Sequence, residues 1–171
     1  MPRLSVGDAA PNFDLASTED VVLMLRDEIP RSAVLLYFFD GPDNKRARRD
    51  LTELAARHTS FAGLDMKILG ISATKLEELR TLQRELELPF PLLFDDRGFS
   101  SLFGFEVGEG GGAEPVMVLV NRDQRVLWLG DGSAELETSL GEVEGRLESL
   151  PSSTANYPRS VINRLVDLWV N

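Results

Sequence analysis

Continuous apolar runs alternate along this chain with segments whose apolar residues recur at helical spacing. The run at 34–39 is typical of a strand that is covered on both faces of a sheet. The segment that follows places Ala47 and Leu51 on one face of an amphipathic helix. Asp43 or Asn44 can cap the start of that helix. The pattern predicts a buried strand, a turn and a helix, the unit at which α/β proteins usually carry their chemistry.

The rest of the chain repeats this alternation. The predicted strands lie at 66–72, 89–94, 116–121 and 125–129, and the predicted helices at 75–86, 100–105 and 133–150, with short strands also expected within 4–15. Strands that alternate with helices favour a parallel sheet, and the hairpin near the end adds antiparallel strands. We therefore expect an α/β protein, a three-layer α/β/α sandwich with a mixed central sheet and a C-terminal helical extension.

The composition of the chain changes at Pro151. Residues 1–150 are long enough for one domain with a full core, and 151–171 read as a linker followed by a short amphipathic helix. We expect that helix to pack on its own domain or on a protein partner, a second copy of the chain in a dimer included. Its predicted contact residues are Val161, Leu165, Leu168 and Trp169.

Charge and hydropathy narrow the classes of partner. The formal net charge is -10 at pH 7, which argues against a nucleic-acid partner because such binding needs a basic surface. No apolar run approaches the length that crosses a bilayer, and the N-terminus lacks the apolar core of a secretory signal. We expect a cytoplasmic protein with neither a nucleic-acid nor a membrane partner.

The residue types that usually carry chemistry are scarce. The chain has no cysteine and a single histidine, His58, which excludes thiol catalysis and thiolate metal sites by this chain. One histidine cannot build a histidine metal cluster or a serine–histidine triad, and we expect a structural role for His58. Asp95, Asp96 and Asp131 offer too few clustered oxygens for a hard cation. No metal and no cofactor are predicted.

Five short motifs follow one another in a recognisable order. They are V-G-D-x-A-P-x-F-x-L at 6–15, L-Y-F-F at 36–39, I-L-G-I-S at 68–72, L-P-F-P-L-L-x-D at 88–95 and V-L-V-N-R-D at 118–123. This series resembles the peroxiredoxins of the alkyl hydroperoxide reductase and thiol-specific antioxidant (AhpC/TSA) group. The resemblance covers about residues 4–150 and implies a thioredoxin-like fold and an antioxidant oxidoreductase family.

The resemblance fails at the positions that would carry the chemistry. In the family, a motif Y-F-Y-P-x-x-x-T-x-x-C supplies a thiolate that attacks peroxide, an arginine stabilises that thiolate, and the threonine helps to stabilise the developing charge. Here the proline position holds Asp40 and the threonine position Asn44, while the cysteine position holds Ala47. The arginine position holds Pro115, and the resemblance to other thioredoxin-like proteins implies a cis Glu114–Pro115 bond. We expect a degenerate active site with no catalytic residue.

Basic residues crowd the start of the predicted central helix, where positive charge is unfavourable. Lys45, Arg46 and Arg48 could form an anion site together with the free N–H groups of the first helical turn. The alternative, which we favour, is a solvated face with ion pairs such as Arg46 with Asp50.

These observations together predict a redox-inactive, peroxiredoxin-like protein that acts by binding a protein or a small ligand. One alternative is an antioxidant thiol peroxidase whose cysteine was removed by mutagenesis or whose thiol comes from a partner. Another is a small-ligand binding domain that uses the old peroxide pocket near Asn44, Ala47 and Pro115.

Overall fold

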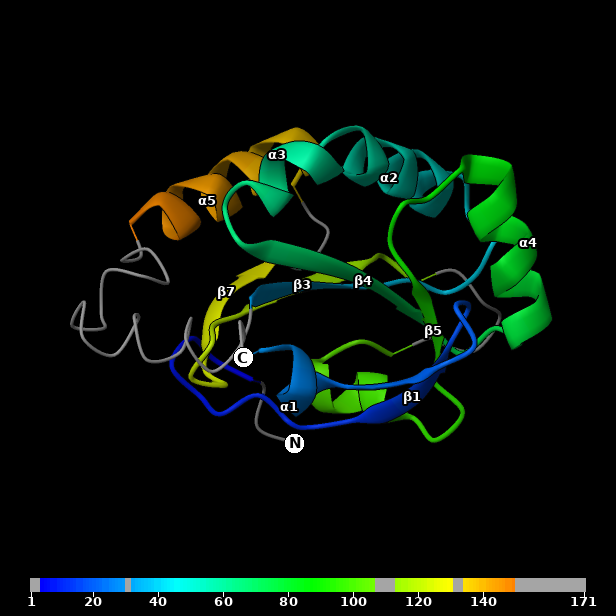
Figure 1. Ribbon diagram of the computed structural model, residues 1–171, viewed down its shortest axis with the longest axis horizontal. Helices are drawn as coiled ribbons and strands as arrows, with labels where there is room; N and C mark the ends of the chain where they lie inside the picture. Colours follow the sequence, from blue (N-terminus) through cyan, green and yellow to red (C-terminus); the bar gives the residue numbers. More distant parts are fainter. Residues whose placement is uncertain (1–3, 30–31, 107–112, 131–133, 150–171) are drawn as a thin grey trace, which may run out of the picture.

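A mixed sheet of seven strands forms the centre of the protein (Figure 1). The computed structural model describes residues 4–29, 32–106, 113–130 and 134–149. The strands are β1 (Asp14–Ser17), β2 (Val22–Met24), β3 (Ala33–Phe38), β4 (Met66–Ser72), β5 (Leu92–Phe94), β6 (Val116–Val120) and β7 (Val126–Gly130). They are ordered β2-β1-β5-β4-β3-β6-β7. The neighbours β3, β4 and β5 run parallel, and the remaining pairs are antiparallel.

Helices cover both faces of this sheet, as predicted, but unequally. The helices are α1 (Leu25–Glu28), α2 (Lys45–Ala56), α3 (His58–Ala62), α4 (Leu76–Leu86), α5 (Leu136–Glu148) and the 3-10 helix η1 (Phe99–Phe103). One apolar core packs the sheet against α2, α3, α4 and α5, and Figure 1 shows α2, α3 and α5 above the sheet and α4 at its right-hand side. Within the described residues, the opposite core is covered by α1, η1 and the segment before β1. The three layers of the prediction are present, and in the described part of the chain one outer layer is much thinner than the other.

β3 positions the candidate site, because it lies between β4 and β6 and is buried along its whole length. Leu35 and Tyr37 point into the core beneath the long helices, and Leu36 and Phe38 point into the other core, as the two-residue period of a strand requires. Phe38 pairs with Val116 of β6. The residues just after β3 therefore lie beside the residues just before β6.

Two predicted elements differ in detail from the structure. Within 4–15 only the last residues join a strand, since β1 starts at Asp14 and the earlier segment turns at Gly7, whose φ is +94°. The 100–105 helix is the 3-10 helix η1, which ends at Gly104 with φ +88°. Glycine adopts these positive φ angles without a steric penalty, so both positions favour turns over continued regular structure.

The last part of the chain is only partly described. Ser133, at the start of the helix expected at 133–150, lies outside the described residues, and α5 begins after Glu135, whose side chain makes no capping hydrogen bond. The predicted linker and helix within 151–171, with Val161, Leu165, Leu168 and Trp169, also lie outside them. None of the helices in the described ranges is long and apolar enough to span a membrane.

Candidate functional site

The loop after β3 places Asn44 at the start of α2, where it caps the helix. Its backbone is extended, with φ -75° and ψ 113°, and its side-chain oxygen accepts a hydrogen bond of 3.0 Å from the Ala47 N–H. This satisfies one of the backbone donors that a helix leaves free at its N-terminus. The predicted cap is confirmed, and the residue at the family's threonine position serves the helix itself.

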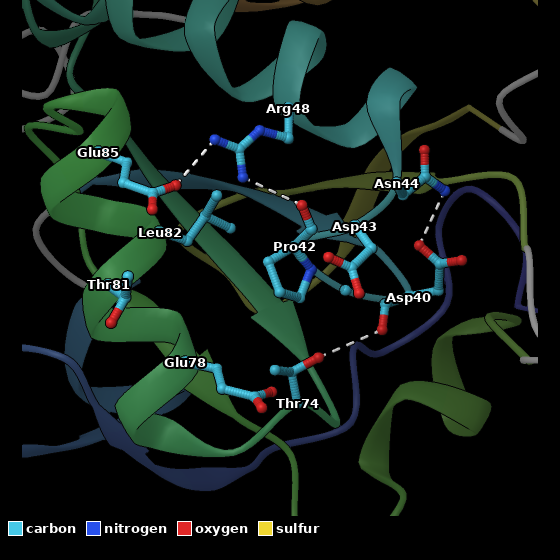
Figure 2. A pocket seen from close by; sticks show the side chains of 11 residues that line it. Asp40, Pro42, Asp43, Asn44, Arg48, Thr74, Glu78, Thr81, Leu82 and Glu85 are labelled. Atoms are coloured by element: carbon cyan, nitrogen blue, oxygen red, sulfur yellow. Dashed lines mark hydrogen bonds and ion pairs between the residues drawn. The ribbon is translucent and has the colours of Figure 1, made fainter.

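Asp40 joins three parts of the fold. One carboxylate oxygen accepts a hydrogen bond of 2.8 Å from the Asn44 amide, as Figure 2 shows. The other accepts one of 3.2 Å from the backbone N–H of Ala113, in the segment before β6. The backbone oxygen of Asp40 accepts hydrogen bonds from the hydroxyls of Ser72 and Thr74, each at 3.3 Å. Asp40 thus ties the end of β3 to α2, to the segment before β6 and to the end of β4.

The cysteine and arginine positions of the family both hold buried apolar residues. Ala47 is 0% exposed and belongs to the core beneath the long helices. Pro115 is buried next to the β3–β6 pairing. The described chain contains no cis peptide bond, so the expectation of a cis Glu114–Pro115 bond is wrong. A trans bond is the ordinary preference of an X–Pro pair, and here it agrees with the approach of Ala113 to Asp40.

Three polar side chains are linked between β3 and α2, and the hydrogen bond of Tyr37 in this group was not predicted from the sequence. The Tyr37 hydroxyl donates a hydrogen bond of 2.8 Å to the Asp50 carboxylate, and Asp50 is only 3% exposed. Burial, together with the negative charge of Asp50, raises the pKa of Tyr37 far above its ordinary value. Arg46 lies 3.5 Å from the same carboxylate, so the predicted pair is present, but the expectation that it lies on a solvated face is wrong because Asp50 is buried. The signal in the sequence was the hydroxyl of Tyr37, which needs a hydrogen-bond partner when its otherwise apolar strand is buried.

The three predicted anion-binding residues do not converge on one place. Arg46 reaches Asp50 and the backbone oxygen of Ala134, near α5. Arg48 donates hydrogen bonds to the backbone oxygen of Pro42 at 3.1 Å and to Glu85 of α4 at 2.8 Å (Figure 2). Lys45 is exposed. Both arginines already form hydrogen bonds or ion pairs with groups of the protein itself, and these three side chains do not form one shared binding site for an anion. The anion site stays a prediction.

An open pocket of about 570 Å³ lies between the 40–44 loop, α2 and α4 (Figure 2). It is lined by Asp40, Gly41, Pro42, Asp43, Asn44, Arg48, Thr74, Glu78, Thr81, Leu82 and Glu85. The lining carries four carboxylates and one guanidinium, a balance that disfavours anions. Ala47 and Pro115 are not among the lining residues. This pocket therefore faces α4 and does not coincide with the old peroxide pocket of the sequence analysis.

The remaining candidate side chains have structural partners. The ring of His58 lies 6.4 Å from that of Phe90. Asp95 accepts hydrogen bonds from the start of η1, including the backbone N–H of Ser100 at 2.7 Å. Burial would raise the pKa of Asp95, but these hydrogen bonds outweigh it and hold that pKa below its ordinary value. Asp131 lies outside the described residues, among which no three acidic or histidine side chains are placed to share a metal ion.

Comparisons with known proteins agree with this geometry. Peroxiredoxin Bcp of Bacillus subtilis is 28% identical over 93 residues, which cover 54% of this chain and 59% of that protein. The structure of peroxidoxin BcpB from Mycobacterium tuberculosis superposes with a TM-score of 0.80 at 18% identity, covering 88% of this chain and 100% of that one. Peroxiredoxin Q of Xylella fastidiosa gives a TM-score of 0.75 at 16% identity, with 85% and 98% covered.

The two structural likenesses establish the fold alone, and they confirm the predicted thioredoxin-like sandwich. The alignment with the Bacillus protein spans only about three fifths of that relative's length. The strongest sequence finding is the family model, described as the AhpC/TSA family, which matches residues 6–129. Since that match covers well over half of the chain, this protein belongs to the AhpC/TSA family.

Proposed function

We propose that this chain is a redox-inactive member of its family that acts by binding a protein or a small ligand. The observation that supports this most directly is Ala47, a methyl group at the position where the family carries its reactive thiol. Reduction of a peroxide by this family needs a sulfur atom that is oxidised to sulfenic acid and then resolved by a second thiol. Neither sulfur exists in a chain without cysteine.

The surroundings of Ala47 support the same proposal. In the family an arginine and the helix N-terminus stabilise a negative sulfur. Here Pro115 has no charge to offer, and Asp40 brings a carboxylate to the start of α2. A thiol at position 47 would lack the arginine that stabilises the thiolate in the family. The replacements therefore form a consistent set, which disfavours the loss of one cysteine by mutagenesis.

A thiol supplied by a partner is disfavoured by burial. Ala47 is 0% exposed, and the helix cap and the segment before β6 lie over the start of α2. A partner's sulfur would have to displace these contacts before it reached the place where the family's chemistry occurs. The alternative of an antioxidant peroxidase completed in trans lacks an open site in the described part of the chain.

The binding role is proposed to use the C-terminal segment, in a dimer or with another protein, in the cytoplasm. The net charge of -10 suits a protein of the cytosol. The apolar residues Val161, Leu165, Leu168 and Trp169 recur at helical spacing, with few charges between them. Deletion of Pro158 to Asn171 is expected to lower the oligomer size measured by light scattering. Leu165→Asp is expected to act like the deletion, and Asp167→Ala, on the polar side of the same segment, to leave the size unchanged.

A peroxide-consumption assay with dithiothreitol as reductant tests the central proposal. The full chain is expected to consume hydrogen peroxide and an alkyl hydroperoxide no faster than buffer does. Clear turnover would show that a group other than a thiol of this chain performs the reaction, and would overturn the proposal.

Restoring the family residues provides the matched positive control. Ala47→Cys alone is expected to stay slow, because the new thiol lacks both the arginine and the threonine of the family. Adding Asp40→Pro, Asn44→Thr and Pro115→Arg is expected to create measurable turnover. Fast turnover by Ala47→Cys alone would show that the other three positions do not limit the chemistry and that the site is less degenerate than proposed.

A further inference from the structure

The segment that leads into β6 is fastened to the start of α2 by side chains at two of the family's active-site positions. The Asp40 carboxylate accepts from the Ala113 N–H at 3.2 Å and from the Asn44 amide at 2.8 Å. The same amide nitrogen lies 3.5 Å from the Ala113 backbone oxygen. Both backbone polar groups of Ala113 thus face the Asp40–Asn44 pair.

The same contacts use up the polar groups that a ligand would need. The side-chain oxygen of Asn44 is taken by the Ala47 N–H, and its nitrogen by Asp40. Beneath them Ala47 is 0% exposed, and Pro115 is buried. The neighbouring pocket opens toward α4 and includes neither of these two residues.

We propose that Asp40, Asn44 and Ala113 form a latch that keeps the family's peroxide-binding site closed in this chain. The closing group is a carboxylate supplied by the protein, joined through one amide side chain to the N-terminus of α2. Hydrogen bonds to a charged acceptor are stronger than neutral ones, so a few of them hold two segments that lie 73 residues apart in the chain. The latch rests on contacts alone and does not depend on the proposed binding function.

Amide hydrogen exchange of the full chain tests the latch. Asp40→Ala is expected to speed exchange of the Ala113 amide by about tenfold or more, the usual effect of losing a hydrogen bond to a charged group. Asp43→Ala is the matched control, because Asp43 is an exposed aspartate of the same loop and has no part in these contacts. The Val118 amide, in the buried middle of β6, is the internal reference and is expected to keep its rate in both variants.

Equal Ala113 rates in Asp40→Ala and Asp43→Ala would overturn the proposal. If Asp40→Ala also speeds exchange of the Val118 amide, the sheet as a whole has loosened. In that case the milder variant Asp40→Asn tests the latch. That variant keeps one acceptor oxygen but loses the charge. It is expected to speed Ala113 alone, by a smaller factor. No acceleration, or acceleration shared with Val118, would then refute the latch.

A second readout measures access to the closed site. Ala47→Cys creates the only thiol in the chain, so its alkylation by iodoacetamide reports how often the site opens. With rates corrected to equal thiolate fraction, adding Asp40→Ala is expected to speed alkylation by about tenfold or more, and adding Asp43→Ala is expected to change little. Fast alkylation of Ala47→Cys alone, as in a free thiol, would show that the site is already open.

Discussion

The buried hydrogen bond between Tyr37 and Asp50 gives the most informative stability experiment. Both residues are almost completely buried, Tyr37 at 0% and Asp50 at 3% exposure, and the two oxygens lie 2.8 Å apart. Tyr37→Phe removes only the hydroxyl and leaves the carboxylate with Arg46 at 3.5 Å. A hydrogen bond to a charged group contributes about 1.5–3 kcal/mol, which is the expected loss.

Asp50→Ala is expected to cost more than Tyr37→Phe. It leaves the buried Tyr37 hydroxyl without its acceptor, which costs about 1–3 kcal/mol in addition to the lost hydrogen bond, and it also removes the carboxylate that pairs with the partly exposed Arg46. The double variant should then lose less than the sum of the two single losses. The difference, the coupling energy, is expected at about 1.5–3 kcal/mol if the hydrogen bond carries the effect.

Urea unfolding followed by tryptophan fluorescence measures these free energies, and thermal unfolding provides a check at about 2–4 °C per kcal/mol for a domain of this size. Thr52→Val is the matched control, since Thr52 is exposed and its hydroxyl bonds only to the backbone of its own helix. Its effect is expected within about 0.5 kcal/mol. A coupling energy below about 0.5 kcal/mol would refute the view that this hydrogen bond stabilises the fold.

Three further predictions concern single positions. Asn44→Ala is expected to cost about 1–2 kcal/mol in urea unfolding through the lost helix cap, whereas Asn44→Ser, which keeps a capping oxygen, should recover most of it. The pKa of Asp95 is lower in the folded state than in the unfolded chain, so the ionised Asp95 stabilises the fold above the unfolded pKa of about 3.9, and this stabilisation is lost as the pH falls below that value. Asp95→Asn should therefore reduce the loss of unfolding free energy at acid pH. An unchanged loss would contradict the lowered pKa of Asp95. Gly70→Ala would place a methyl group 2.5 Å from Leu92 and should cost about 1–3 kcal/mol, while Gly141→Ala, in open space on α5, should gain about 0.5–1 kcal/mol by chemical denaturation. Equal effects at the two glycines would rule out packing as the cause.

The central strands and helices could be predicted from the sequence because each of their hydrophobic patterns is typical of only one kind of secondary structure. The apolar run that ends at Phe39 and the run at 66–72 became the central strands β3 and β4, and the helical spacing within 75–86 became α4. Val21 and Val22 are also apolar, but both side chains are more than half exposed, and Val22 belongs to the edge strand β2. An apolar run alone does not reveal whether a strand lies at the centre or the edge of a sheet.

The sequence was sufficient to predict which residues lie at the candidate site, but not which hydrogen bonds they form there. The alignment of motifs located Asp40 and Ala47 at the family's chemical positions. The hydrogen bond from Ala113 to Asp40 depends on the register of β3 against β6, and a single sequence gives no register for strands so far apart. The Asp50 carboxylate, on a helix with many charged residues, looks like a surface group until its burial is known.

The thin outer layer of the sheet has a consequence for synthesis of the chain. The segment before β1 is held to β7 by hydrogen bonds from Gly7 to Val126 and from Ala10 to Gln124, more than 110 residues later. A nascent chain therefore exposes this segment early but cannot dock it until the hairpin strand has emerged from the ribosome. Contacts so distant in sequence form slowly, and an uncovered apolar face invites aggregation while it waits. The segment before β1 is made long before β7 but docks only after it, so the demand for chaperones should be greatest while this segment waits for β7.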